Sequence, residues 1–261
     1  MNTGTGAITG YFDVAQIALY VFWGFFAGLI YYLHREDKRE GYPLESDRSD
    51  RSGGRVKVQG FPAIPKPKIY RAHDGQITVS PREEKDPRTI MAKPSGPFPG
   101  APLVPTGNPM LDGVGPASYA LRATHPDTMV NGEPMIVPLR VDPSFSVSVK
   151  DFDPRGMEVY GADKVLAGVV SDLWVDRGEP QIRYLEVETL NGRHVLLPIY
   201  YTRFNRFRRR VNVKSILGSQ FATVPANANP DYVTRREEDQ IMAYYASGHM
   251  YATAARSEPL I

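Results

Sequence analysis

The sequence of 261 residues contains no cysteine. This absence excludes disulfide bridges, thiolate catalysis, thiolate zinc sites and iron–sulfur clusters held by cysteine. An excess of charge of one sign is also lacking, because 31 basic residues stand against 29 acidic residues. The resulting formal net charge of +2 argues against a strongly electropositive nucleic-acid coat and against an acidic disordered tail.

Catalytic and ligand-binding motifs are scarce as well. The five histidines, at positions 34, 73, 125, 194 and 249, show no metal-ligand spacing, so we expect no metal site. Gly113 and Gly115 lack the third glycine and the preceding strand of a dinucleotide-binding loop, and no phosphate-binding loop or nucleophile elbow is present. We therefore expect no autonomous catalytic site, and a stand-alone enzyme is the least favoured interpretation.

One long apolar run is present near the N-terminus. From Val14 to Leu33 the chain has twenty residues without a charged side chain. Twenty helical residues rise about 30 Å, the thickness of a bilayer's hydrocarbon core. The ten Leu, Ile, Val and Phe side chains in the run together contribute about −3 to −6 kcal/mol at mid-membrane. Residues 1–13 lack the basic residues of a signal peptide, so we predict a transmembrane helix over 14–33.

The orientation of this span follows from the basic residues around it. None precedes the span, and several follow it closely: Arg35, Lys38, Arg39, Arg48 and Arg51. The positive-inside rule therefore predicts that residues 1–13 lie outside the cell membrane and that everything after the span lies in the cytoplasm.

Gly24 and Gly28 lie four residues apart within the span and leave one helix face nearly bare of side chains. Such a face lets a neighbouring membrane helix approach closely. Glycine is also simply common in membrane helices, and both interpretations stay open.

The stretch after the span is rich in proline. Seventeen of the 23 prolines lie between Pro43 and Pro143. Proline lacks the N–H donor that helices and central strands need, so little regular structure is expected here. Apolar residues such as Phe61, Tyr70 and Phe98 argue against a free linker. We predict an extended irregular segment over 34–150 that lies on the surface of a partner.

The last part, residues 151–261, changes to the pattern of short strands. Lys164–Val175 and Ile182–Leu190 are rich in β-forming residues, and Asn191-Gly192 joins the second run to His194–Ile199, which is a strong hairpin signal. Val211–Val213 offers a further short strand. Several short strands at this spacing predict a small antiparallel β-barrel.

A short C-terminal helix completes this domain. Thr234 and Glu237 have the spacing of a capping box. Ile241, Tyr244 and Tyr245 then fall on one helical face before Gly248.

Two clusters of polar residues remain. Arg203–Arg210 mixes five arginines with two aromatic residues, the composition of a nucleic-acid patch, although a solvated edge or one facing lipid headgroups or acidic neighbours fits the near-neutral charge better. The second cluster lies on one predicted hairpin, and its type is most often a solvated face. Its members are Asp172, Asp176, Glu179, Arg183, Glu186 and Glu188.

Several segments have a distinctive sequence. In chain order they are AGLIYYL (27–33), REDKREGYPLESD (35–47), GNPMLDGVGPASYALR (107–122), DPRGMEV (153–159), VSDLWVDRGEPQIRYLEVE (170–188), LLPI (196–199) and EEDQIMAYYASGHMYATA (237–254). Together they resemble the H subunit of the purple-bacterial photosynthetic reaction centre. The resemblance runs in order over nearly the whole chain.

The resemblance implies a single transmembrane helix that follows a periplasmic segment over 1–13, an irregular segment over the cytoplasmic face of the L and M subunits, and a mainly-β domain with a PRC-type barrel. It implies no cofactor bound by this chain alone. The complex would carry bacteriochlorophyll, bacteriopheophytin, quinones, non-haem iron and a carotenoid. The implied location is the bacterial inner (intracytoplasmic, chromatophore) membrane, with membrane lipid, a cytochrome subunit and the light-harvesting antenna as further neighbours and no nucleic acid.

The resemblance also implies a role for part of the acidic cluster. In the family, the subunit shields the secondary quinone site and supplies part of the proton route to it. A glutamate on that route matches Glu179, an arginine four residues later matches Arg183, and a nearby aspartate matches Asp176. The implied roles are proton relay for Glu179, electrostatic tuning for Arg183 and support of the relay for Asp176.

One departure from the family concerns the point at which protons enter. Some members have an Asp-Gly-His-Gly-His stretch where this chain has residues 129–133, so the histidine pair is missing. Protons then enter elsewhere, or His125, Asp127 and Glu133 form a substitute.

The leading hypothesis is therefore a non-pigmented structural and proton-conducting subunit of a photosynthetic complex. The alternative is a membrane-anchored PRC-barrel adaptor that binds RNA or ribosomal protein through Arg203–Arg210. PRC-type barrels also occur in a ribosome-maturation factor, so the fold alone does not decide function.

Overall fold

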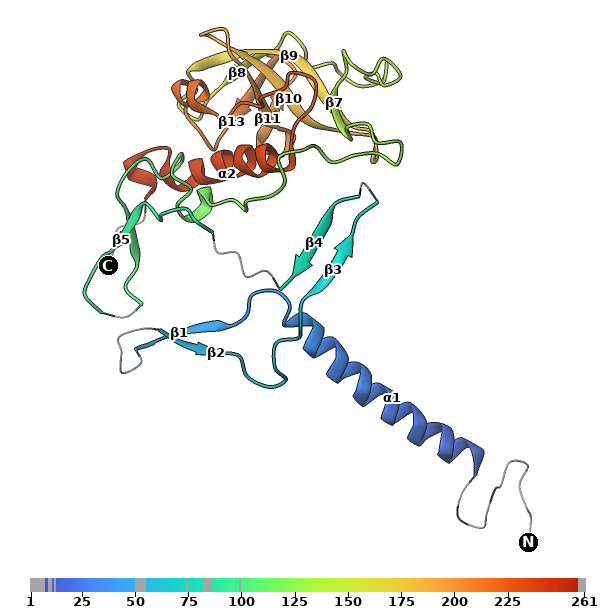
Figure 1. Ribbon diagram of the computed structural model, residues 1–261. Coiled ribbons are helices and arrows are strands. Elements are labelled where there is room, and N and C mark those ends of the chain that lie inside the picture. The colour runs from blue at the N-terminus through green and yellow to red at the C-terminus, as the bar shows by residue number, and fades with distance from the viewer. Residues whose placement is uncertain are drawn as a thin grey trace. The chain divides into compact units, whose positions relative to one another are not determined.

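The computed structural model describes residues 8, 11, 13–49, 55–73, 75–81, 86–98 and 100–257. The chain forms two compact units, residues 1–85 and 86–261 (Figure 1). Most of the predicted periplasmic segment 1–13 lies outside the described residues, as does Arg51. The division of the chain at residues 33 and 150 rests on composition and stays a prediction.

The first unit begins with a long helix, α1 (Val14–Asp37). Asp13 caps it, because its side chain accepts a hydrogen bond from the backbone N–H of Gln16 at 2.7 Å. The helix continues four residues past the predicted end at Leu33, since no helix-breaking residue follows. None of its residues is buried, and it is long and apolar enough to cross a membrane.

Gly24 and Gly28 lie on this exposed helix. A Cβ atom added at either position would meet nothing within 4 Å among the described residues. The bare face is therefore open in this chain, and its proposed role in helix packing stays a prediction.

The two basic residues that follow α1 hold the chain against the helix end. Lys38 is buried and donates hydrogen bonds to the carbonyl oxygens of Gln59 at 2.5 Å and Pro62 at 2.6 Å. Arg39 is also buried and donates to the carbonyl oxygen of Lys66 at 2.7 Å. These charge-assisted bonds fix the start of the proline-rich segment where it leaves α1.

The proline-rich stretch is extended, as predicted, but it includes three short antiparallel hairpins that the prolines did not predict. Their strands are β1 (Leu44–Ser49), β2 (Arg55–Val58), β3 (Lys68–Arg71), β4 (Ile77–Ser80), β5 (Ala92–Pro94) and β6 (Leu103–Pro105). Two-stranded ladders leave half of the backbone donors facing outward, so short strands fit between prolines or end on them. The first two hairpins belong to the first unit and the third to the second unit.

The second unit is built on one mixed sheet (Figure 1). Its strands are β7 (Ile136–Pro138), β8 (Glu158–Tyr160), β9 (Leu166–Asp176), β10 (Gln181–Thr189), β11 (His194–Pro198), β12 (Thr202–Asn205) and β13 (Arg210–Val213). The strand order is β11-β10-β9-β8-β13-β12, β7 pairs with β9, and the β8–β13 pair alone among these is parallel. The predicted mainly-β domain is confirmed, and in the described residues the sheet does not close into a barrel.

The predicted hairpin at Asn191-Gly192 joins β10 to β11, and Gly192 takes a positive φ of 76° that suits glycine. The pairing of β10 with β9 sets two cross-strand positions that matter below. Glu186 lies opposite Asp172 in the middle of the strands. Gln181 lies opposite Asp176 at their connecting turn.

Helix α2 (Arg235–Tyr251) begins with the predicted capping box. Thr234 Oγ1 accepts from the N–H of Glu237 at 3.2 Å, and the Glu237 carboxylate accepts from the N–H of Thr234 at 2.8 Å. Ile241, Tyr244 and Tyr245 are buried and belong to the same apolar core as the sheet. The predicted helical face is confirmed.

The helix does not end before Gly248, as the sequence predicted, but runs on to Tyr251. Gly248 is needed for packing, since a Cβ there would lie 2.5 Å from the carbonyl oxygen of Ser215. The glycine therefore marks a close contact between α2 and the chain after β13. The described residues also include four short 3₁₀ helices: Gly115–Ala117, Ile199–Tyr201, Gly218–Thr223 and Ala254–Arg256.

Candidate functional site

A cavity of about 410 Å³ lies at the turn that joins β9 to β10. It brings together all three predicted proton-transfer residues and one of the three residues predicted to take up protons. Its lining residues are Arg122, Asp127, Met135, Ile136, Asp176, Gly178, Glu179, Arg183 and Glu238.

Asp176 shapes the turn. It is 6% exposed, and its Oδ1 accepts hydrogen bonds from the backbone N–H groups of Gly178 at 3.0 Å and Glu179 at 3.1 Å. This is the geometry in which an aspartate stabilises a turn through its own following backbone. Its Oδ2 lies 3.8 Å from Nε of Arg183, so the predicted aspartate and arginine form an ion pair.

Glu179 occupies the exposed end of the turn. Its Oε2 accepts one hydrogen bond, from Gln181 Nε2 at 3.2 Å. Among the described residues, no ion pair joins it to Arg183, whose partner is Asp176. An exposed carboxylate with free lone pairs can exchange protons with water, whereas one surrounded by fixed donors cannot readily do so.

Glu238 is, together with Arg122, an ionisable residue of this cavity that the sequence reasoning missed as a site residue. It lies in the first turn of α2, and the hydroxyl of Tyr184 donates to its Oε2 at 2.9 Å. Burial raises the pKa of Glu238, and the nearby positive charges of Arg183 and Arg122 offset only part of this effect. No local pattern in the sequence indicates that Glu238 lies near Glu179, because more than fifty residues separate them.

The three residues named as a substitute for the missing proton-entry histidines do not line one cavity. Asp127 lines the cavity and pairs with Arg235 at 2.6 Å. Burial acts to raise the pKa of Asp127, but the hydrogen bond and charge of Arg235 outweigh it, so the pKa lies below its usual value. Glu133 and His125 do not line the cavity: Glu133 pairs with Arg177 at 3.0 Å, and His125 Nδ1 lies 2.9 Å from the carbonyl oxygen of its neighbouring proline.

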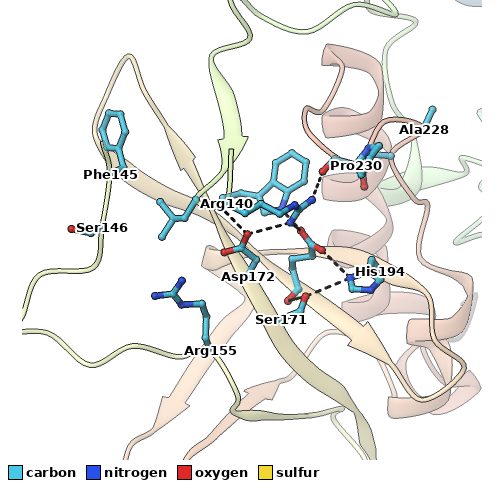
Figure 2. Close-up of a pocket in the computed structure, with 13 residues that line it drawn as sticks. Arg140, Phe145, Ser146, Arg155, Ser171, Asp172, His194, Ala228 and Pro230 are labelled. Atoms are coloured by element: carbon cyan, nitrogen blue, oxygen red, sulfur yellow. Dashed lines mark hydrogen bonds and ion pairs between the residues drawn. The ribbon is translucent and has the colours of Figure 1, made fainter. Parts of the chain in front are cut away.

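A second carboxylate cluster lies in the middle of the same two strands, beside a larger cavity of about 810 Å³ (Figure 2). Arg140 Nη1 bridges the two carboxylates, at 2.6 Å from Glu186 Oε2 and 3.2 Å from Asp172 Oδ2. Trp174 Nε1 donates to Glu186 at 2.8 Å, and His194 Nδ1 lies 2.8 Å from its other oxygen. Every oxygen of Glu186 therefore has a fixed partner.

The acids of this hairpin are not all a solvated face, and that interpretation is wrong for three of them. Asp172, Asp176 and Glu186 are 7%, 6% and 6% exposed, because each turns inward to a donor within the fold. Burial acts to raise the pKa of Glu186, but the bonds from Arg140, Trp174 and His194 prevail and lower it. Glu186 is thus held as an anion.

The described residues contain no group of three or more His, Asp or Glu side chains arranged to hold a metal ion. The cavity at the β9–β10 turn is lined mainly by charged side chains. Such a lining suits water and protons better than an apolar pigment.

Two family models match the chain. The model of the photosynthetic reaction centre H-chain N-terminal region matches residues 6–141, slightly more than half of the chain. The PRC-barrel domain model matches residues 147–220. Asp127 falls within the first match, and Asp176, Glu179 and Arg183 fall within the second, so the cavity draws its residues from both. The chain with its apolar N-terminal helix and PRC-barrel sheet therefore belongs to the family of photosynthetic reaction-centre H chains, accessory subunits that associate with the L and M core.

Proposed function

We propose that this H subunit covers the secondary quinone site of the core and conducts protons toward it through the cavity at the β9–β10 turn. One observation supports this above all. Six ionisable groups that include Glu179, Asp176 and Glu238 come from distant parts of the chain and line one cavity. A purely structural role would not explain why these ionisable groups line the same cavity.

The chemistry of the substrate explains why protons must be delivered. Reduction of a quinone to a quinol consumes two electrons and two protons, and a buried anion is costly. A negative charge about 10 Å from a carboxylate contributes roughly 1.7 kcal/mol at an effective dielectric of 20. This raises the pKa of the carboxylate by a little over one unit, enough to draw a proton from solvent.

The residues of the cavity have distinct roles in this proposal. Glu179 is exposed and takes a proton from water. Glu238, whose pKa burial raises, holds a proton within the cavity more readily than an ordinary carboxyl group. A cavity of about 410 Å³ has room for waters that link the two. Asp176 and Arg183 fix the turn and balance its charge.

The proposal extends to the location and the neighbours of the chain. We place residues after α1 on the cytoplasmic side of a bacterial inner (intracytoplasmic) membrane, because basic residues follow the helix and none precedes it. The pigments, quinones, non-haem iron and carotenoid would belong to the complex rather than to this chain. A cytochrome subunit and the antenna are further neighbours in this proposal, and the Gly24–Gly28 face is where a helix of the complex would pack.

Flash kinetics of the intact complex test the proposal. Glu179→Gln removes the titratable group, so the proton-coupled second electron transfer should slow about tenfold while the first is unchanged. The matched control is Glu188→Gln, the same change at an exposed position of β10 outside the cavity, which should leave both rates unchanged. Unchanged second-transfer kinetics in Glu179→Gln would contradict the assignment.

A further inference from the structure

The hairpin formed by β12 and β13 is the most basic part of the second unit. Between Glu188 and Asp231 the sequence has no acidic residue. The basic residues of this interval are Arg193, Arg203, Arg206, Arg208, Arg209, Arg210 and Lys214. This local excess of positive charge contrasts with the near-neutral net charge of the whole chain.

The tip of this hairpin is ordered. The N–H of Arg209 donates to the carbonyl oxygen of Arg206 at 3.2 Å, and the N–H of Arg208 donates to Asn205 Oδ1 at 3.0 Å. These bonds fix the turn that contains Phe207, whose side chain is fully exposed at 103%. The ring therefore contributes nothing to the core of this chain.

The arginines around Phe207 face solvent. Arg203, Arg206, Arg208 and Arg209 are exposed, and within the described ranges none of them forms an ion pair. Arg206 instead stacks on Phe152, with its guanidinium 4.3 Å from the ring centre. Guanidinium groups without acidic partners are well suited to bind phosphate oxygens.

We propose that this hairpin tip, residues 203–210, docks on the surface of the anionic phospholipid bilayer that the chain itself spans. Phosphates of anionic lipids supply the charge that the arginines lack, and the headgroup interface accommodates an aromatic ring beside them. Lipid is favoured over RNA as the binding partner because α1 anchors the chain in the bilayer. The hairpin is therefore always near the lipid surface, which raises the effective concentration of lipid headgroups around it. This inference goes beyond the proton-conducting role and can fail independently of it.

The cysteine-free sequence makes a direct test simple. Phe207→Cys in the full chain, labelled with a polarity-sensitive fluorophore, is reconstituted in bilayers of phosphatidylcholine alone or mixed equally with phosphatidylglycerol. We expect a blue-shifted emission, quenched by spin-labelled lipid, in the mixed bilayer and a loss of both at high salt. The matched control is Val130→Cys, which is 98% exposed in the same unit but lies in the turn before β7 and not in the basic hairpin, and its label should stay water-like throughout.

Removing charge sharpens the test. Arg208→Gln and Arg209→Gln in the labelled background should each lower the ratio of bound to free tip about fivefold, since a basic residue near an anionic surface contributes about 1 kcal/mol. Both side chains are exposed, so the fold should be kept, which circular dichroism checks.

Three results would overturn the proposal. The first is a label at position 207 that stays water-like in both bilayers. The second is a label that single-stranded RNA protects without anionic lipid, which would favour the nucleic-acid alternative. The third is a label that the assembled core shields equally in both lipid compositions, which would assign the tip to a protein partner.

Discussion

Two carboxylate clusters on the same pair of strands differ in how many fixed donors they meet. In the middle of β9 and β10, Asp172 and Glu186 lie opposite each other and share Arg140. At the connecting turn, Glu179 is exposed and accepts a single bond from Gln181. The same residue types thus meet several fixed donors in one place and a single described donor in the other.

Burial alone does not explain this difference. Glu186 is buried and Glu238 is partly buried, yet the pKa of Glu186 is lowered and that of Glu238 is raised. Glu186 meets an arginine, an indole N–H and a histidine, whereas the hydrogen-bond donor to Glu238 is the hydroxyl of Tyr184. The number and charge of the donors decide whether a buried carboxyl group can hold a proton.

Arg140→Met should have the largest effect on stability. It leaves two buried carboxylates without their shared cation, and we expect a loss of about 3 kcal/mol in the free energy of unfolding. The expected loss lies at the low end of the range for breaking a buried ion pair, because 39% of the Arg140 side chain is exposed. Urea denaturation of the full chain in detergent measures this loss of stability.

The control variant is Arg155→Met. Arg155 lies beside the same cavity but forms a local, exposed ion pair with Asp153, so this change should alter the free energy of unfolding by less than about 1 kcal/mol. Equal losses in the two variants would refute the role of Arg140.

Asp176→Ala should have the next largest effect. It removes the acceptor of two backbone N–H groups at the turn, which should cost about 1–2 kcal/mol. Asp176→Asn keeps an oxygen for these bonds and loses only the charge that faces Arg183, so its loss should be smaller. Thermal unfolding compares the two, and an equally large loss for asparagine would show that the ion pair, and not the turn, needs Asp176.

Glu238→Gln should change the pH dependence of stability. Because the folded-state pKa of Glu238 lies above its ordinary value of 4.5, ionisation costs the folded state more than the unfolded state. The free energy of unfolding of the wild type therefore falls as pH rises from 4.5 through the folded pKa. The variant escapes this loss, since its amide oxygen still accepts from Tyr184. We expect Glu238→Gln to be the more stable protein at neutral pH, with the difference disappearing below pH 4.5 in a melting series. A constant difference at all pH values would contradict the raised pKa.

Asp127→Asn should have the smallest effect. Its ion pair with Arg235 is partly exposed, and solvent screening limits such pairs to about 0.2–1 kcal/mol. The folded pKa of Asp127 is lowered from 3.8, so the wild type has this stabilisation above pH 3.8 and loses it as pH falls through the folded pKa. A difference between the two proteins that persists at strongly acid pH would point to a role for Asp127 other than this ion pair.

Local signals in the sequence were enough to predict much of the fold. The apolar run of α1, the Asn191-Gly192 hairpin and the Thr234–Glu237 capping box each depend on neighbouring residues, and the structure confirms all three. Gly248 misled the prediction of a helix end, because its close contact with Ser215 is a tertiary feature that no local pattern shows.

The candidate site was predicted only in part, for the same physical reason. The turn residues Asp176, Glu179 and Arg183 are neighbours in the sequence, and the resemblance to a family drew attention to them. Arg140 and Glu238 reach their partners across 46 and 54 residues, distances over which charge pattern carries no information about contact. The burial of Glu186 likewise depends on this distant arginine.

Proton uptake after the second flash, followed with a pH-indicator dye in the intact complex, tests the contrast between the two clusters most directly. Glu179→Gln and Glu186→Gln make the same chemical change at two carboxylates. Glu179 is exposed and accepts a bond from Gln181, whereas both oxygens of Glu186 have fixed partners. We predict that Glu179→Gln slows uptake about tenfold and that Glu186→Gln leaves its rate unchanged. Slow uptake in Glu186→Gln together with normal uptake in Glu179→Gln would contradict the account.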